Sequence, residues 1–536
     1  MSDREAPAGT EKLNTKAAGL VGLAVLCSRV LGLVREQIGA ALFGGGWVMD
    51  AFTIAFRIPN LLRDLFAEGA LSTVFTTVFS KTVATQGTDA AWRLANKTWT
   101  LAIIFLSSLT LLGIVFAPEL VALLAPGFTG EKAQLTITLT RVMYPFILLV
   151  SLAALAMGML NARNVFGVPA MASSFFNLGS IVVGIGLGWW LDPNFGTRAV
   201  MGLAIGTLVG GALQLLVQIP SLYRQGYVYH PDVQWRDPGV KSILRLMGPS
   251  VIAGSTTQVN VMINSVFASG VGNGAVFALA IAFRLMQLPL GLFGVALSTV
   301  SLPLLARMAA LGNLDTFRTE LARGMRLAFL LTIPATVGLI VLAGPIMSVL
   351  YQHHRYDAVQ TALAAGTLQF YALGLAGYAA LKVLVNSFYA LEMRRTPMMV
   401  SLAAVGLNLL LNWIFTLHLG WGARGLAFAT ACIANTNFLV LYLLMRRRLG
   451  RLDTGAMAGM LVRLLPAVLA LVAVCWAGSH FALADWATQA FWSKLLWLMA
   501  TIVMGAAVFL GGAVAMRVAE MDQLGGVVKR RFNRGR

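Results

Sequence analysis

The chain has 536 residues, of which 58% are hydrophobic and only 11% are charged, and its mean hydropathy is +0.78. A soluble globular protein has about 25% charged residues, so this composition excludes an ordinary soluble enzyme and a disordered chain. It indicates a chain that lies mostly in lipid. The three cysteines (Cys27, Cys432 and Cys475) are isolated within apolar segments, which predicts neither a disulfide nor a metal site.

Fourteen apolar segments are long enough to cross a bilayer, because a hydrocarbon core about 30 Å thick needs roughly 20 helical residues. The segments lack the period-2 alternation of barrel strands, so the predicted fold class is an all-α polytopic membrane protein. The segment that precedes the first span is polar, and we expect no cleaved signal peptide. In chain order the predicted spans are 17–42, 50–79, 97–117, 136–160, 166–191, 199–222, 243–269, 275–305, 325–350, 362–391, 397–419, 423–445, 458–480 and 492–516.

The distribution of Lys and Arg between these spans predicts the orientation. Of the 40 basic residues, 27 fall on the side that holds both termini, 5 fall on the opposite side and 8 lie within spans. The positive-inside rule therefore predicts that both termini are cytoplasmic. Topology and anionic lipid explain the net charge of +19, and we expect no nucleic-acid partner.

An internal repeat relates the two halves of the chain. The triplet AFR occurs at 55–57 and again at 282–284, and LSTV occurs at 71–74 and again at 297–300, so both motifs recur at nearly the same offset. Six spans separate the copies, so both copies insert with the same orientation. The predicted domains are two six-helix lobes, 1–223 and 224–452, and an addition of two helices with a basic tail, 453–536. Parallel repeats are typical of transporters that rock one lobe against the other, although a duplicated scaffold is an alternative.

Charged residues inside the spans are the candidate functional groups, because a charge at mid-bilayer costs at least about 2.5–3.5 kcal/mol. Arg141 and Arg463 lie near span ends and are expected to snorkel, whereas Lys382 lies deeper and stays ambiguous. The remaining charges within the spans are the basic residues Arg29, Arg35, Arg57, Arg63 and Arg284 and the acidic residues Glu36, Asp50, Asp64 and Glu68.

Helical geometry places most charges of the second span on one face. At 100° per residue, six polar side chains fall within an arc of about 80°, whereas Arg63 lies off this arc and Pro59 is a candidate kink. Arg29 and Glu36 likewise share one face of the first span. These faces are predicted to line a hydrated cavity between the lobes. The six residues are Asp50, Thr53, Arg57, Asn60, Asp64 and Glu68.

The surplus of arginine favours a ligand with phosphate oxygens, since guanidinium groups bind phosphate bidentately and stay charged. Asp50 is a candidate latch whose pairing with an arginine competes with the ligand. Arg284 occupies the place in the second lobe that Arg57 has in the first, so an anion between them would contact both lobes. Two alternatives remain open: ion pairs with the acids as structural glue, and an Arg284 that snorkels to a headgroup.

Several motifs together resemble the lipid II flippase family, MurJ/MviN, within the superfamily of multidrug, oligosaccharidyl-lipid and polysaccharide exporters. These motifs are SRVLGLVRE (28–36), DAFTIAFRIPNLLRDLFAEGALS (50–72), APGF (125–128), RLMQLPLGLFGVALSTVSLP (284–303) and the stretch from Lys382 to Tyr389. The resemblance implies translocation of undecaprenyl-pyrophosphate disaccharide-pentapeptide from the cytoplasmic to the periplasmic leaflet by alternating access. It also implies a drive by membrane potential or an ion gradient, no cofactor, a monomer, and cell-wall synthesis proteins as partners.

The resemblance also assigns residues. The cavity arginines of the family correspond to Arg29, Arg35, Arg63 and Arg284 here, and its cavity aspartate corresponds to Asp50. Arg57 stands where Lys is common, Glu36 where Asp is common and Asp64 where some members have Arg. Spans 458–480 and 492–516 are expected to form, with the second lobe, a groove for the isoprenoid tail.

Three alternatives to this function differ in their chemistry. An exporter of another lipid-linked oligosaccharide would need the same cavity, and only the family resemblance distinguishes it from a lipid II flippase. A cation-coupled multidrug exporter would need an acidic or aromatic cavity, which the arginine surplus opposes. A membrane-embedded enzyme would need a catalytic group, but His353 and His354 lack a zinc-type pattern and no Gly-rich phosphate motif precedes a helix, so no catalytic or metal site is predicted.

Overall fold

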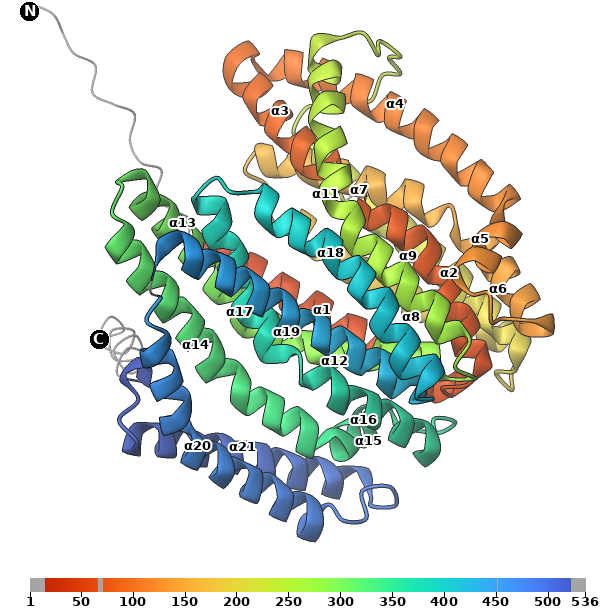
Figure 1. Ribbon diagram of the computed structural model, residues 1–536. Coiled ribbons are helices and arrows are strands. Elements are labelled where there is room, and N and C mark those ends of the chain that lie inside the picture. Colours follow the sequence, from red (N-terminus) through yellow and green to blue (C-terminus); the bar gives the residue numbers. More distant parts are fainter. Residues whose placement is uncertain (1–14, 66–70, 451, 522–536) are drawn as a thin grey trace, which may run out of the picture. The chain divides into compact units, whose positions relative to one another are not determined.

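The structure is a computed structural model that describes residues 15–65, 71–450 and 452–521, and this part of the chain contains helices and no strands (Figure 1). The chain divides into two compact units. Unit 1 comprises Met1–Gly39, Ala55–Leu120 and Thr136–Gly254, and unit 2 comprises Ala40–Ile54, Val121–Leu135 and Ser255–Arg536. The all-helical fold class is confirmed. The units cut through several helices and do not coincide with the predicted lobes, which stay a prediction.

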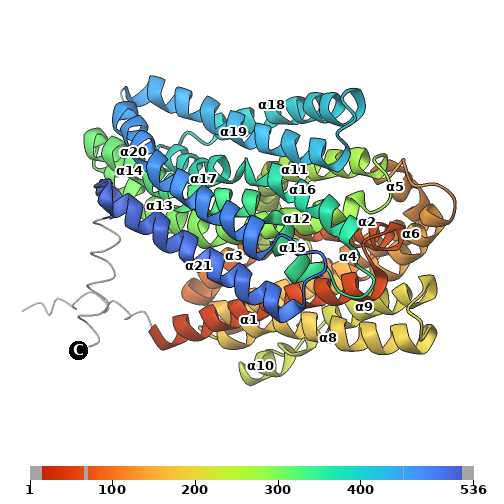
Figure 2. The same ribbon diagram turned by 90° about the horizontal axis from the view of Figure 1, so that it is seen from below.

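Unit 1 is built around an antiparallel pair of glycine-rich helices, α8 and α9, which lie side by side in both ribbon views (Figures 1 and 2). Glycines let the two backbones approach closely, as is usual for membrane helices. The helices that lie wholly or partly in this unit are α1 (Thr15–Phe43), α2 (Trp47–Arg63), α3 (Ser72–Gln86), α4 (Thr88–Val115), α5 (Ala117–Leu124), α6 (Gly130–Met143), α7 (Phe146–Ala162), α8 (Gly167–Leu191), α9 (Val200–Leu216), α10 (Ile219–Arg224) and α11 (Pro238–Ser269).

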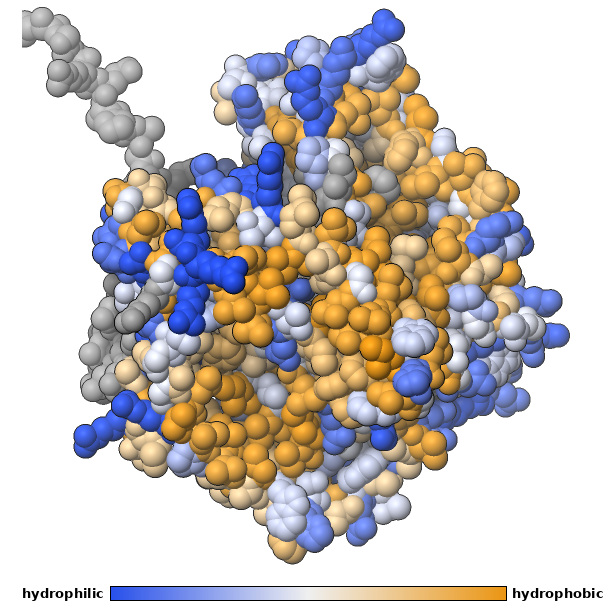
Figure 3. Space-filling model, in the orientation of Figure 1, coloured by the Kyte–Doolittle hydropathy of each residue, from blue (hydrophilic) through white to orange (hydrophobic). Residues whose placement is uncertain are grey.

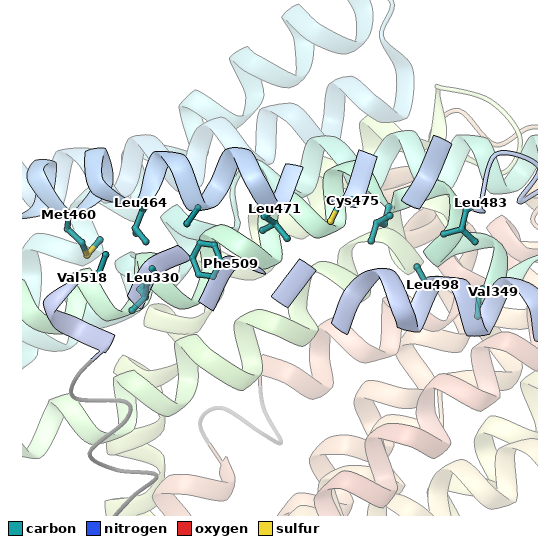
Figure 4. Close-up of a cluster of buried hydrophobic side chains, with 13 residues drawn as sticks. Leu330, Val349, Met460, Leu464, Leu471, Cys475, Leu483, Leu498, Phe509 and Val518 are labelled. Carbon is teal, nitrogen blue, oxygen red and sulfur yellow. The ribbon is translucent and has the colours of Figure 1, made fainter. Parts of the chain in front are cut away.

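Unit 2 contains parts of several of these helices and all later ones. An apolar cluster packs α20 and α21 together and against α14 and α15, through Leu464, Leu471 and Phe509 among others (Figure 4). The later helices are α12 (Ala275–Pro289), α13 (Ala296–Ala310), α14 (Leu314–Val341), α15 (Ala343–Tyr351), α16 (Ala358–Ala372), α17 (Leu375–Ala390), α18 (Arg395–Asn412), α19 (Gly422–Leu449), α20 (Thr454–Ala477) and α21 (Phe491–Ala515).

A ladder of side-chain amides joins α11 to α18 in unit 2. Asn408 Nδ2 donates to Asn260 Oδ1 at 2.7 Å, and Asn412 Nδ2 donates to Asn264 Oδ1 at 2.8 Å. Each helix carries its two asparagines one turn apart, so the two pairs stack along the same faces. Hydrogen bonds of this kind between membrane helices are worth about 0.6–2 kcal/mol each.

Within the described residues, ten helical segments are long and apolar enough to cross a membrane, and α16 with α17, bent by 42°, gives an eleventh. These eleven confirm predicted spans, and Figure 3 shows hydrophobic side chains over α18, where Met399, Leu402 and Leu410 are exposed. Predicted spans 17–42, 50–79 and 243–269 contain helices but are not among the eleven. In span 50–79 the helix α2 has only 17 residues, and in span 243–269 the helix α11 carries the polar run STTQVN.

Several predicted spans contain more than one helix. Span 50–79 contains α2, which ends at Arg63, and α3, which begins at Ser72. Span 275–305 likewise contains α12, a π-helical segment η3 (Leu290–Val295) and α13. Hydropathy locates an apolar stretch but does not show whether it forms one helix or two. The reason is that hydropathy depends on composition, which is the same in both cases.

Candidate functional site

The basic residues of α1 and α2 belong to unit 1. Arg29 and Arg35 lie about two turns apart on α1, and Arg57 and Arg63 lie on the second half of α2. Arg29 is exposed, whereas the other three side chains are half-buried among apolar helices. The structure thus places four of the five predicted phosphate-binding arginines on two consecutive helices of one unit.

Aromatic rings support the guanidinium group of Arg35. Its Cζ atom lies 4.9 Å from the ring centroid of Phe176 on α8 and 5.8 Å from that of Phe56 on α2. Both rings pack against Phe146, with centroids 5.5 Å apart in each case. Such cation–π contacts hold a charged group in place without neutralising it. The sequence analysis missed this support, since α8 lies far away in the chain.

A second contact between α8 and α1 lies about two turns from Arg35. The side-chain amide of Asn177 donates to the backbone carbonyl of Ser28 at 3.1 Å and to that of Ser173 at the same distance. Gly32 also faces the Asn177 side chain, and a Cβ atom at this glycine would lie 3.6 Å from the amide nitrogen. The adjacent residues Phe176 and Asn177 therefore fix both the backbone of α1 and one of its arginines.

Arg63 forms an ion pair with the residue next to it. Its Nη2 atom lies 2.8 Å from Asp64 Oδ1, and Nε of the same arginine donates to that oxygen at 3.2 Å. The side chains keep 21% and 33% of their exposure, so water screens the pair. Asp64, at a position where some family members have Arg, thus lowers the local positive charge. Glu36 is half-buried on α1, and Glu68 lies outside the described residues.

Asp50 forms a different kind of site, which lies within unit 2. Its side chain is fully buried and accepts three hydrogen bonds. Oδ2 accepts from Lys132 Nζ at 2.9 Å and from the backbone N–H of Gly274 at 2.7 Å, and Oδ1 accepts from the N–H of Phe277 at 2.9 Å. The last two groups are the N-cap and the third residue of α12. Asp50 therefore caps a helix to which it does not belong, where a negative charge also complements the helix dipole.

The surroundings of Asp50 are tightly packed. Gly274 has a φ of +84°, and a Cβ atom there would lie 2.4 Å from the carbonyl oxygen of Gly45, so only glycine fits this position without strain. Lys132 also donates to Asn273 Oδ1 at 3.1 Å, and its Nζ lies 4.0 Å from the ring centroid of Phe128. We refer to Asp50, Lys132, Asn273, Gly274 and Phe277 as the Asp50 network.

Further contacts join neighbouring loops to this network. Gly45 N donates to Gln360 Oε1 at 2.7 Å, and Gly127 N in the APGF motif donates to Ser269 Oγ at 3.0 Å. A pocket of about 360 Å³ adjoins the network. Trp47, Gly127, Thr129, Glu131, Lys132, Ser269, Gly270, Gly272 and Asn273 line it.

Two predictions for Asp50 differ from the structure. Its ionic partner is Lys132, whereas the sequence analysis expected an arginine, and the carboxylate is buried, whereas the shared polar face of span 50–79 was expected to face water. Lys132 was counted only as one of five basic residues on the external side. The helical wheel fixes which face of α2 a residue occupies, but not which loop covers that face.

Two further predicted charges within spans, Arg284 and Lys382, lie in unit 2. Arg284 is exposed on α12, and Lys382 is half-buried on α17. The predicted pairing of Arg284 with Arg57 across a cavity stays a prediction, because the two residues belong to different units. Within the described residues no group of three or more His, Cys, Asp or Glu side chains could hold a metal ion.

The fold and these charges define a multi-pass helical membrane protein of the transporter class. The family model for the lipid II flippase MurJ matches residues 39–497. The lipid II flippase MurJ of Burkholderia cenocepacia is 36% identical over 429 residues, covering 79% of this chain and 82% of the relative. The probable lipid II flippase MurJ of Vibrio cholerae is 34% identical over 437 residues, covering 80% and 82%. The chain therefore belongs to the MurJ family.

Solved structures agree on the fold. A structure described as lipid II flippase MurJ in an inward closed conformation has a TM-score of 0.72 and 24% sequence identity, covering 92% of this chain and 99% of that one. An inward-facing multidrug resistance MATE family transporter of the MOP superfamily has a TM-score of 0.59 and 18% identity, covering 81% and 95%. The resemblance inferred from the motifs is thus confirmed for both family and fold.

Proposed function

We propose that this chain translocates lipid II, the undecaprenyl-pyrophosphate disaccharide-pentapeptide, from the cytoplasmic to the external leaflet of the inner membrane for cell-wall synthesis. The observation that carries this proposal is the set of four arginines on α1 and α2, three of which are half-buried. Each guanidinium group can bind two phosphate oxygens at once, so several arginines together can bind a pyrophosphate. A cationic drug would be repelled by it, which opposes a multidrug substrate.

The proposed architecture has fourteen membrane helices, with lobes at 1–223 and 224–452 and an addition at 453–536. The helix starts support the duplication. Helices α2 and α12 begin at Trp47 and Ala275, and their successors α3 and α13 begin at Ser72 and Ala296. The offset between copies is nearly the same for both pairs, and it is close to that of the repeated AFR and LSTV motifs. Two successive helices at matching positions in each copy would result from duplication of one ancestral element.

The proposed orientation has both termini in the cytoplasm, and we expect the chain to act as a monomer that meets cell-wall synthesis proteins. The imbalance of 27 against 5 basic residues supports this orientation. It places the start of α2, the start of α12 and Lys132 on the external side. The Asp50 network would then join helix ends at the external surface.

In this proposal the Asp50 network keeps the external end closed while lipid II enters from the cytoplasmic leaflet. Breaking its three hydrogen bonds would let the external end open, so the protein would alternate between two access states. A ligand can shift such an equilibrium only by binding one state more tightly than the other. Guanidinium groups that bind the pyrophosphate in one state would supply that difference.

The proposed drive is the membrane potential or an ion gradient, without a cofactor. The arginines of α1 and α2 carry charge within predicted spans, on which an electric field acts. Each elementary charge that crosses the membrane contributes about 2.3 kcal/mol per 100 mV. A few charges moving through part of the field would therefore match the energy of a few hydrogen bonds.

The test is reconstitution of the purified chain in vesicles with labelled lipid II, followed by measurement of its exposure in the outer leaflet. We expect Arg29→Ala, Arg63→Ala and Arg284→Ala each to slow translocation by at least about ten-fold, the loss of one charge-assisted hydrogen bond. The control is Arg463→Ala, since Arg463 is exposed on α20. Wild-type rates in all three cavity variants would refute the proposal.

A further inference from the structure

The loop between α10 and α11, residues 226–237, is fastened along α4 by its backbone and side chains. We call this segment the strap. The hydroxyl of Thr100 on α4 accepts from the N–H of Asp232 at 3.0 Å and lies 3.0 Å from the hydroxyl of Tyr229. One turn earlier on α4, Asn96 Oδ1 accepts from the N–H of His230 at 3.2 Å. Three polar contacts therefore hold the middle of the strap to one face of α4.

Both ends of the strap are anchored as well. At its beginning Tyr227 is 3% exposed and packs against Trp92 and Trp99, with ring centroids 5.1 and 5.9 Å apart. At its end the carboxylate of Asp237 lies 2.7 Å from Lys97 Nζ. A loop without regular secondary structure is thus fixed at both ends and in the middle, and such fixation costs conformational entropy.

The outer side of the strap displays an apolar and basic surface. Trp235 is 55% exposed and Val233 is 58% exposed. The guanidinium of Arg236 lies 5.0 Å from the indole centroid of Trp235. Lys241 and Arg245 are exposed one turn apart at the start of α11, so they share one face of that helix. The strap therefore presents a large aromatic ring beside Arg236, and the start of α11, which follows it directly, adds two exposed basic side chains.

The level of the strap relative to the membrane follows from its anchors. Lys97 begins the predicted span 97–117, and Thr100 is one turn inside it. The strap consequently runs along the edge of the hydrocarbon region, on the side where the basic residues of the chain gather. Tryptophan is enriched at this level because its ring is amphipathic, and basic residues there attract the negative cytoplasmic leaflet.

We propose that the strap is a binding site for the headgroups of anionic phospholipids in the cytoplasmic leaflet. The indole of Trp235 would lie at the headgroup level, while Arg236 and Lys241 would bind the lipid phosphate. This inference rests on the predicted orientation but not on the substrate of the transporter. An anionic lipid held beside α4 and α11 would tie the cytoplasmic ends of these helices to the leaflet from which substrate enters.

The experiment places a fluorophore on the strap and measures which lipids approach it. A cysteine introduced by Val233→Cys, in a full-length chain with the three native cysteines replaced, is labelled and reconstituted in phosphatidylcholine vesicles. Quencher-labelled phosphatidylglycerol and quencher-labelled phosphatidylcholine are then compared at equal mole fraction. We expect stronger quenching by phosphatidylglycerol, with a preference that falls as salt is raised.

Two matched double variants decide the origin of this preference. Arg236→Gln/Lys241→Gln should lower it by about five-fold for each charge removed, because each basic residue near the surface contributes about 1 kcal/mol. Arg447→Gln/Arg448→Gln removes two exposed charges at the end of α19 and should leave it unchanged. Equal losses in both variants, or no lipid preference in the parent chain, would overturn the proposal. A lipid preference that survives in Arg236→Gln/Lys241→Gln would overturn the proposal too. If cells that carry this variant then grew poorly, the strap would bind a protein partner instead.

Discussion

Replacing Asp50 by asparagine tests whether the Asp50 network closes the external end. Asn keeps the size of the side chain but removes its charge. Its NH2 group must also face at least one of the three groups that now donate hydrogen bonds to Asp50. Hydrogen bonds to a charged group are worth about 1.5–3 kcal/mol each, so losing one and weakening two costs about 3 kcal/mol. In an open state Asp50, Lys132 and the first amides of α12 would bind water instead. The substitution would therefore destabilise the closed state and leave the free energy of the open state nearly unchanged.

A shift of about 3 kcal/mol corresponds to roughly a hundred-fold change in the equilibrium between closed and open states. The assay labels a cysteine introduced by Thr53→Cys, one turn beyond Asp50 on α2, with a membrane-impermeant maleimide from the external side. Thr53 is half-buried. We expect Asp50→Asn to raise the labelling rate by at least about ten-fold, because part of the shift can be lost to relaxation around the new side chain.

Two further variants make this prediction specific. Glu131→Gln removes a carboxylate from the lining of the adjoining pocket and should leave labelling unchanged. Lys132→Gln should raise labelling, and its effect should not add to that of Asp50→Asn, because the two side chains form one ion pair at 2.9 Å. An unchanged labelling rate in Asp50→Asn, or fully additive effects, would refute the role assigned to this network.

Two other predictions concern unit 1. Phe176→Leu removes one of the two rings beside Arg35, a contact worth about 0.5–2 kcal/mol. We expect it to slow lipid II translocation several-fold while the thermal stability of the chain changes less. An unchanged rate would contradict a positioning role for the ring. Burial alone would raise the pKa of Asp237, but its hydrogen bonds with Lys97 and two backbone N–H groups outweigh burial and lower that pKa. The stability contributed by the ionised carboxylate is therefore present above the ordinary aspartate pKa and is lost as the pH falls through the lowered value. Acid unfolding of the wild type should accordingly show a loss of stability below about pH 4 that Asp237→Asn does not share.

Most of the membrane helices could be predicted from hydropathy, and three of the predicted spans stay predictions. Eleven of the fourteen predicted spans coincide with apolar helical segments. Among these three, span 243–269 carries the polar run STTQVN on α11, and in span 50–79 the helix α2 has only 17 residues. Composition averaged over a span distinguishes lipid from water, but polar residues that face other helices dilute the signal at the positions where function requires them.

The site could be predicted less completely, because its residues come from distant segments. The sequence indicates that Arg35 is a charge within a span, but not that Phe176 lies beside its guanidinium group. It also singles out Asp50, but pairs it with the wrong type of residue, since Lys132 is 82 positions away in the chain. The signal that could have found this pair is position: both residues lie near the same end of predicted spans on the external side.

The chemistry of the Asp50 network suits the role proposed for it, a contact that forms and breaks in each transport cycle. A carboxylate, an ammonium and the free amides of a helix N-terminus are each well hydrated when exposed, so opening exchanges three strong hydrogen bonds for water rather than leaving bare polar groups. The net stabilisation is then a few kcal/mol, much less than the gross energy of the bonds. An apolar closure of equal area would expose hydrophobic surface to water on opening and would hold more tightly. A polar closure keeps the two states close in free energy, within the range that substrate binding or a few charges in the membrane field can reverse.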